Sequence, residues 1–90
     1  VLVTGGTGFL GPWIVHETQQ TFPDAKVFVL VRGANAEDAR KRLEKDMAAA
    51  RLKLSTQVEV LAGDLIRPHF GLPDAEWNRL ISRLYLVIHS

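Results

Sequence analysis

The sequence predicts an α/β fold built on a doubly wound parallel sheet. Apolar segments of strand length alternate with longer segments of helical periodicity along all 90 residues, an order typical of a parallel sheet covered by helices on both faces. The segment Lys26–Arg32 (KVFVLVR) is apolar between its charged ends, as expected of a strand buried on both faces. The first apolar segment, Val1–Thr4, runs directly into a glycine-rich turn. Together these features predict the β-α-β-α-β-α-β portion that opens a Rossmann-type fold, within a single domain over residues 1–90.

Two further strands are expected, at Gln57–Ala62 and Tyr85–His89, because both segments are rich in β-branched or aromatic residues. The chain begins inside the first expected strand and finishes as the fourth ends. We therefore expect these residues to be the N-terminal fragment of a longer protein, and a fragment of this size to bury too little surface for good stability alone.

The first two segments between the strands have helical patterns. The first helix is expected from about Gly8 or Phe9 to Thr21, with an apolar side made of Leu10, Trp13, Ile14 and Val15. Asn35 can cap the second helix. Its apolar residues recur in steps of three and four: Ala36, Ala39, Leu43, Met47, Ala50 and Leu54.

A third helix is expected after Pro73, with Asp74 as its cap. Its buried stripe should consist of Trp77, Leu80, Ile81 and Leu84. The order of elements is then strand and helix in strict alternation, ending on the fourth strand.

Composition excludes several functional classes. Eleven basic and ten acidic residues give a net charge of +1, so nothing favours binding to nucleic acid or to an anionic membrane surface. The chain has no cysteine, which excludes disulfides and thiolate chemistry in this segment and fits a cytoplasmic protein. Its longest apolar runs have five residues, too few for a membrane helix. The three histidines, His16, His69 and His89, lack the spacing of metal ligands, so no metal is expected.

Three glycines, Gly5, Gly8 and Gly11, follow the first strand and open the first helix. A strand that breaks into such a turn and restarts as a helix can receive the pyrophosphate of a dinucleotide at the helix N-terminus. Gly6, Gly8 and Gly11 also satisfy the G-x-G-x-x-G spacing. A purely structural glycine turn is the alternative. A phosphate-binding loop of the kind found in nucleoside triphosphatases is excluded, because Pro12 and Trp13 stand where Lys and Ser or Thr are needed.

Arg32 ends the second strand, 21 residues after Gly11. NAD-binding domains place an Asp or Glu near this position for the ribose 2′-hydroxyl, whereas an Arg can bind a 2′-phosphate, so we expect NADP(H) as the cofactor. The alternative is a solvated Arg that closes a strand. Asp64, at the tip of the third strand, could accept a hydrogen bond from the adenine amino group or could simply form a turn, and the residues leave both open. The basic cluster Arg40-Lys41-Arg42 is mostly the exposed face of a helix, although one member could reach the cofactor.

Taken in order, the motifs TGGTGFLG, VRG followed by EDARKRL, GDLIRPHFGL and VIHS resemble the N-terminal part of thioester reductase domains. Such domains occur in nonribosomal peptide and polyketide synthetases, carboxylic acid reductases and aminoadipate reductases, and they are extended short-chain dehydrogenase/reductases. The resemblance covers the whole chain, and GDLIRPHFGLPDAEW is its most specific part. It implies NADPH-dependent reduction of an acyl thioester, held on the phosphopantetheine arm of a carrier protein, to an aldehyde or an alcohol.

The resemblance also implies roles for individual residues. Arg32 would hold the 2′-phosphate, with Arg42 as the second candidate, and Asp64 and Leu65 would contact the adenine. The pyrophosphate would be lined by Gly5, Thr7, Gly8, Phe9, Leu10 and Gly11.

The catalytic residues of such reductases, a Ser or Thr with a Tyr-x-x-x-Lys pair, are expected beyond the fourth strand. Tyr85 is followed four residues later by His89, so it does not match that pair, and we expect the fragment alone to be inactive. Ser90 stands where the family usually has an Asn after the His. Two rival functions remain. One is another extended short-chain reductase, such as a hydroxysteroid dehydrogenase or a sugar-nucleotide epimerase, against which Arg32 counts. The other is a non-catalytic NADP-sensing module.

Overall fold

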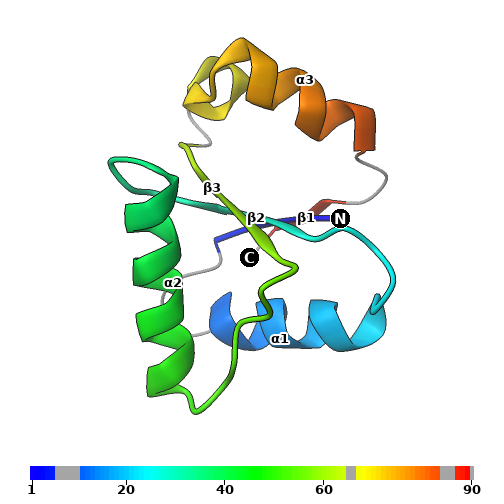
Figure 1. Ribbon diagram of the computed structural model, residues 1–90, viewed down its shortest axis with the longest axis vertical. Helices are drawn as coiled ribbons and strands as arrows, with labels where there is room; N and C mark the ends of the chain where they lie inside the picture. The colour runs from blue at the N-terminus through cyan, green and yellow to red at the C-terminus, as the bar shows by residue number, and fades with distance from the viewer. Residues whose placement is uncertain (6–10, 65–66, 84–86, 90) are drawn as a thin grey trace.

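The computed structural model describes residues 1–5, 11–64, 67–83 and 87–89. Four parallel strands form one sheet: β1 (Leu2–Thr4), β2 (Phe28–Val31), β3 (Glu59–Ala62) and β4 (Val87–His89). The helices are α1 (Gly11–Thr21), α2 (Ala36–Ala49) and α3 (Asp74–Arg83), and a short 3₁₀ turn, η1 (Pro68–Gly71), precedes α3. Figure 1 shows these helices arranged around the sheet.

The strand order is β3-β2-β1-β4. The chain moves outward from β1 through β2 to β3, and then returns to place β4 on the other side of β1. In open α/β sheets ligands bind beyond the carboxyl ends of the strands, at the point where the strand order reverses. That point lies here between β1 and β4. The predicted α/β, doubly wound class is therefore confirmed.

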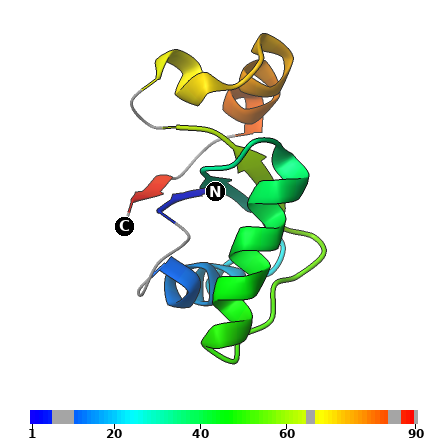
Figure 2. The same cartoon turned by 90° about the vertical axis from the view of Figure 1, so that its left-hand side faces the viewer.

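Helices cover both faces of the sheet: α1 and α2 lie on one face, while η1 and α3 lie on the other (Figures 1 and 2). Alternate strand residues point to opposite faces, as a parallel sheet buried on both sides requires. The α2 face is built from valines in the strands, against which Ala39, Leu43 and Met47 pack. The α3 face carries larger side chains: Leu2, Phe28, Leu30, Leu61, Leu72 and Leu80.

The helix α2 ends earlier than its periodicity predicts. Asn35 caps it as expected, because its side chain accepts a hydrogen bond from Asp38 N. At the other end Arg51 adopts a left-handed conformation, with φ 59°, and Leu52 N donates to Met47 O at 2.8 Å. Leu52 and Leu54 still pack against the core beyond the helix. The pattern was therefore right that Ala39, Leu43, Met47 and Leu54 approach the core, but wrong about Ala36, which is exposed, and about the helix reaching Leu54.

Two apolar side chains are more exposed than predicted. In α1 the buried positions are Gly11, Pro12, Val15 and Thr18, so Trp13 points away from this seam and is 48% exposed. In α3 Leu80 is buried and Trp77 is half-buried, but Ile81 is 46% exposed. The stripe predicted for α3 was therefore wrong for Ile81, and the side chain of Leu84 lies outside the described residues.

The helix α3 begins one residue earlier than predicted, at Asp74 itself. Trp77 N donates to Pro73 O at 2.9 Å, so Asp74 lies in the first turn of the helix and does not precede it as a cap. A carboxylate in the first turn still interacts favourably with the helix dipole.

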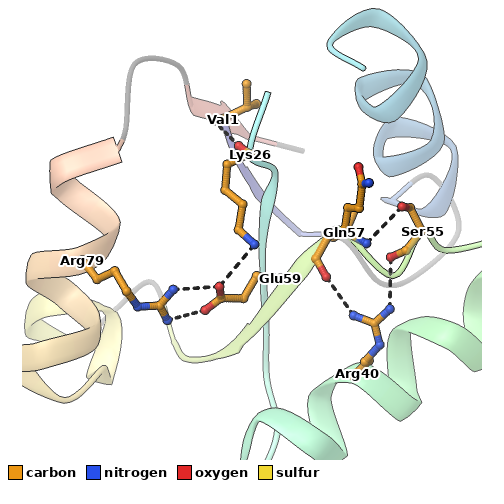
Figure 3. A network of polar contacts seen from close by, with 8 residues as sticks. Val1, Lys26, Arg40, Ser55, Gln57, Glu59 and Arg79 are labelled. Atoms are coloured by element: carbon orange, nitrogen blue, oxygen red, sulfur yellow. Dashed lines mark hydrogen bonds and ion pairs between the residues drawn. The ribbon is translucent and has the colours of Figure 1, made fainter. Parts of the chain in front are cut away.

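A polar network ties the helices to the amino end of the sheet (Figure 3). Arg79 of α3 binds both carboxylate oxygens of Glu59, and Lys26 Nζ lies 3.6 Å from Glu59 Oε1. On the other face, Arg40 of α2 donates to Val58 O at 2.8 Å and to Ser55 O at 3.1 Å. The hydrogen bonds from Arg79 hold the pKa of Glu59 below its usual value. We call Lys26, Glu59 and Arg79 the amino-end network.

None of the helices in the described part of the chain is long and apolar enough to cross a membrane.

Candidate functional site

The carboxyl ends of three neighbouring strands bring predicted site residues to one edge of the sheet. Gly5 directly follows β1, Arg32 follows β2, and Asp64 lies two residues beyond β3. Because these strands are parallel and adjacent, their ends lie side by side. Arg42 reaches the same edge from α2. We call Gly5, Arg32, Arg42 and Asp64 the carboxyl-edge site.

The turn that leaves β1 requires a glycine at its first position. Gly5 has a φ of 69°, in the left-handed region that glycine adopts without a steric cost. Gly11, the last glycine of the motif, is the first residue of α1 and is buried. The predicted site residues Thr7, Gly8, Phe9, Leu10 and Leu65 lie outside the described residues, so their predicted roles stay predictions.

Arg32 and Asp64 form a loose ion pair. Arg32 Nη2 lies 3.5 Å from both carboxylate oxygens of Asp64. The guanidinium is 73% exposed, whereas the carboxylate is 27% exposed. An exposed pair at this separation contributes little to stability, roughly 0–1 kcal/mol. The sequence shows no acidic neighbour at the end of the second strand, and this contact between residues 32 positions apart was not foreseen.

Arg42 acts on the main chain at this edge. Its Nη1 donates to Arg32 O at 2.9 Å, so the side chain is directed to the end of β2 and binds a carbonyl there, while its predicted role toward a 2′-phosphate stays a prediction. The structure thus gathers three of the predicted residues, Arg32, Arg42 and Asp64, within one set of contacts. This contact fixes the main chain from which the Arg32 guanidinium extends.

The loop between β2 and α2 is tightly built. Asp38 Oδ2 accepts from Ala34 N at 3.0 Å, and Asp38 N donates to Asn35 Oδ1 at 2.8 Å. Gly33 has no room for a side chain, because an added Cβ would lie 2.9 Å from Asp38 Oδ2 and 3.0 Å from Ala39 N. The residues after Arg32 therefore hold a defined conformation while its guanidinium extends into solvent.

The main chain also fixes Asp64. Asp64 N donates to Phe70 O at 2.7 Å, across the loop that leads to η1. This approach depends on Gly63, because a Cβ there would lie 2.6 Å from both Phe70 O and Leu30 Cδ1. Reasoning from the sequence missed Gly63 and Phe70 as supports of the site. The Gly-Asp pair after a strand was the available signal, but it indicates only a turn.

No cluster of three or more His, Cys, Asp or Glu side chains suited to a metal ion occurs in the ranges 1–5, 11–64, 67–83 and 87–89. His69 instead stacks on Trp77, with the ring centroids 4.5 Å apart and the planes at 3°. The chemistry that the edge offers is therefore that of an exposed cation, a half-buried carboxylate and a glycine turn.

Residues 3–90 match the model of the male sterility protein family, an NAD-binding family. The chain is 37% identical over 99 residues to the isonitrile lipopeptide synthase of Mycobacterium tuberculosis, covering 100% of this chain and 4% of that protein. It is 35% identical over 96 residues to the L-2-aminoadipate reductase of Saccharomyces cerevisiae, covering 100% of this chain and 7% of that protein.

Among solved structures, the reductase (R) domain of a nonribosomal peptide synthetase from Mycobacterium tuberculosis matches with a TM-score of 0.87 and 36% identity. The match covers 99% of this chain and 23% of that domain. The predicted resemblance is confirmed over the whole chain, which spans only a small part of each relative. The chain therefore belongs to the male sterility protein family of NAD-binding domains, in which it corresponds to the N-terminal part of the reductase domain of nonribosomal peptide synthetases and aminoadipate reductases.

Proposed function

We propose that this chain binds the adenosine and pyrophosphate portions of NADPH within a reductase that acts on acyl thioesters. The thioester would be carried on the phosphopantetheine arm of a carrier domain, and the product would be an aldehyde or an alcohol. The observation that carries the choice of NADPH is the exposed guanidinium of Arg32 at the end of β2.

Arg32 is suited to a phosphate because its present partner holds it weakly. A guanidinium offers five N–H donors in a plane and binds phosphate oxygens through paired, charge-assisted hydrogen bonds. Its pairing with Asp64 uses one nitrogen at 3.5 Å. A 2′-phosphate, which carries more charge than a carboxylate, would outcompete such a contact. We assign the carboxylate of Asp64, which lies beside Arg32, to the adenine amino group.

The remaining residues fit the rest of the cofactor. The left-handed turn at Gly5 leads toward the N-terminus of α1, which begins at Gly11 and presents the positive end of a helix dipole. We assign the pyrophosphate to this turn and to residues 7–10, and the adenine to Asp64 and Leu65. We assign Arg42 a supporting role toward the 2′-phosphate, because it already binds the main chain at Arg32.

When bound, the cofactor supplies the hydride that reduces the acyl carbonyl. The residues of this chain bind and orient the adenosine half, and they leave the chemical step to groups elsewhere in the protein. We assign the Ser or Thr and the Tyr-x-x-x-Lys pair that would stabilise the developing oxyanion to the sequence beyond β4.

Calorimetric titration of the complete protein tests the cofactor assignment. We expect NADPH to bind at least about tenfold tighter than NADH, a difference of about 1.4 kcal/mol. The variant Arg32→Ala should erase most of this difference, whereas Lys45→Ala, which removes one charge from an exposed position of α2, should retain it. Equal affinities of the natural protein for NADPH and NADH would overturn the assignment of Arg32 to the 2′-phosphate.

Oxidation of NADPH with an acyl group loaded on a carrier protein tests the reaction. We expect consumption of NADPH with the thioester, release of an aldehyde or alcohol, and no consumption with the free acid. Turnover of a hydroxysteroid or a sugar nucleotide instead would identify a different short-chain reductase. Tight NADPH binding with no turnover of any of these would favour a sensing module.

A further inference from the structure

The segment between β3 and α3 holds Asp64 through a closed set of main-chain hydrogen bonds. Asp64 N donates to Phe70 O at 2.7 Å, Phe70 N donates to Arg67 O at 2.9 Å, and Arg67 N donates to Asp64 O at 3.1 Å. Gly63 N also donates to Val31 O at 3.0 Å, so the Phe70 carbonyl and the end of β2 together fix the main chain at Asp64.

That carbonyl direction depends on a run of left-handed residues. His69 has φ 52° and ψ 29°, Phe70 has φ 56° and ψ 21°, and Gly71 has φ 71°. Glycine adopts this conformation readily, but His and Phe do so only where surrounding contacts hold them. His69 and Phe70 therefore need contacts from elsewhere in the protein to hold this strained conformation beside the candidate ligand site.

Trp77, on the first turns of α3, contacts both strained residues. The His69 ring stacks on the indole at a centroid distance of 4.5 Å, with an angle of 3° between the planes. The Phe70 ring meets the indole edge-on at 5.3 Å and 81°. Both geometries are favourable for aromatic pairs. Trp77 in turn packs against the α3-face cluster that contains Leu80, so it links the turn to the core.

We propose that Trp77 is a positioning residue of the cofactor site, which holds His69 and Phe70 left-handed and thereby keeps Asp64 beside Arg32. The inference rests on the proposed function, in which Asp64 binds the adenine of NADPH. Gly63 is part of the same device, because only a residue without a side chain leaves the Phe70 carbonyl room to reach Asp64 N. The helix α3 thus influences cofactor affinity without contacting the cofactor.

The competing explanation is that Trp77 only contributes to the core. Leu80 provides the matched control, since it lies on the same helix, is buried in the same cluster, and contacts the sheet. A residue that acts only on stability should behave like Leu80. A residue that acts through Asp64 should lose its effect on affinity when Asp64 is changed.

The test is a double-mutant cycle in the complete protein, with the dissociation constant for NADPH measured by calorimetry. We expect Asp64→Ala, which removes the acceptor oxygens, to weaken NADPH binding by about tenfold, the value of one hydrogen bond to a charged group. Trp77→Ala should weaken it to a similar extent, and the double variant should be no weaker than Asp64→Ala alone. Leu80→Ala should lower the melting temperature and leave the dissociation constant unchanged, while Trp77→Phe should recover most of the affinity.

A second variant covers the case in which Trp77→Ala does not fold. His69 is half-exposed, so His69→Ala should fold, and it removes the stacked ring. We expect it to weaken NADPH binding by about threefold, and to have no effect in the Asp64→Ala background.

Two other results would separate failure of the proposed function from failure of the inference about Trp77. Unchanged affinity in Asp64→Ala would overturn the proposed role of Asp64, and this inference with it. Weaker binding in Asp64→Ala, with effects of Trp77→Ala and His69→Ala that are absent or simply additive, would overturn the inference alone and leave the proposed function standing.

Discussion

The two ends of the sheet treat their charged residues in opposite ways. At the amino end Arg79 binds both oxygens of Glu59, and Lys26 approaches the same carboxylate, so one carboxylate is shared by two cations. At the carboxyl edge Arg32 extends into solvent and meets Asp64 only at 3.5 Å. The main chain at this edge is tightly packed, in contrast to the loosely paired side chains, because Gly63 and Phe70 lie so close that no side chain fits between them.

This contrast separates support from recognition. A bidentate ion pair between α3 and β3 fixes a helix to a sheet and leaves few hydrogen-bond sites for a ligand. A rigid main chain that carries a weakly paired guanidinium has the opposite property, because a ligand can replace the weak partner without disturbing the fold. The amino-end network is therefore expected to control stability, and the carboxyl-edge site to control affinity.

The largest expected effect is that of a methyl group at Gly63. In Gly63→Ala the new Cβ would lie 2.6 Å from Phe70 O and from Leu30 Cδ1, so the loop must move. We expect the free energy of unfolding to fall by about 2 kcal/mol, typical of overpacking, and NADPH binding to weaken as well. Gly71→Ala meets only the flexible side chain of Arg67 and should cost about 1 kcal/mol, from its left-handed conformation. Denaturant unfolding of both variants measures the difference, and a neutral Gly63→Ala would contradict the close packing described here.

The reciprocal pair Arg79→Ala and Arg32→Ala tests the division between the two ends directly. Arg79→Ala removes the bidentate contact with Glu59, and we expect a loss of about 1 kcal/mol in stability with the NADPH dissociation constant unchanged. Arg32→Ala should change stability by less than about 0.5 kcal/mol, because its pair with Asp64 is exposed, and yet weaken NADPH binding. Thermal unfolding and calorimetry on both variants check this. If Arg79→Ala impaired binding as strongly as Arg32→Ala, the division between the ends would fail.

Acid should weaken the amino-end network. The hydrogen bonds from Arg79 hold the pKa of Glu59 below its usual value of 4.5, so the folded protein binds this proton less readily than the unfolded chain. The stabilisation is then complete above about pH 5 and is lost as the pH falls through the lowered pKa of Glu59. The difference in unfolding free energy between the natural protein and Glu59→Gln should therefore shrink as the pH falls below 4.5. A difference that stays constant from pH 7 to acid would show that the charge of Glu59 contributes nothing.

The order and type of the elements could be predicted because each rests on a local pattern. A strand buried on both faces, such as the one around Val29, is a continuous apolar run in the sequence. The glycine turn after Thr4 marks where the first strand must be followed by a helix. Contacts between distant segments leave no such pattern. Nothing in the sequence indicates that Asp64 lies against Arg32, or that Phe70 O supports Asp64, because both depend on how loops meet after the sheet has formed.

Periodicity also identifies a face of a helix without showing how wide the covered part is. Trp13 directly follows the buried Pro12, and Ile81 directly follows the buried Leu80. Each side chain is therefore turned away from the buried side of its helix, and both are nearly half exposed. The same limit applies to helix ends. The helix α2 ends at Ala49, two residues before the left-handed Arg51, although the apolar spacing continues to Leu54.

The smallest expected effect compares strained main chain near the two ends of the sheet. Arg51 lies in the connection from α2 to the start of β3 and has a φ of 59°, in a position where helices commonly have glycine. No proposed ligand group depends on this turn, so Arg51→Gly should raise the free energy of unfolding by about 0.5–1 kcal/mol and leave NADPH affinity unchanged. His69 has a similar φ of 52° at the carboxyl edge, but its ring stacks on Trp77. His69→Gly should relieve the strain, but glycine also allows other conformations of a turn that no stacked ring anchors to Trp77, so NADPH binding should still weaken. Denaturant unfolding and calorimetry on the two variants give the comparison. Equal behaviour of the two glycine variants in binding would show that strain at the carboxyl edge has no more to do with the cofactor than strain at the end of α2.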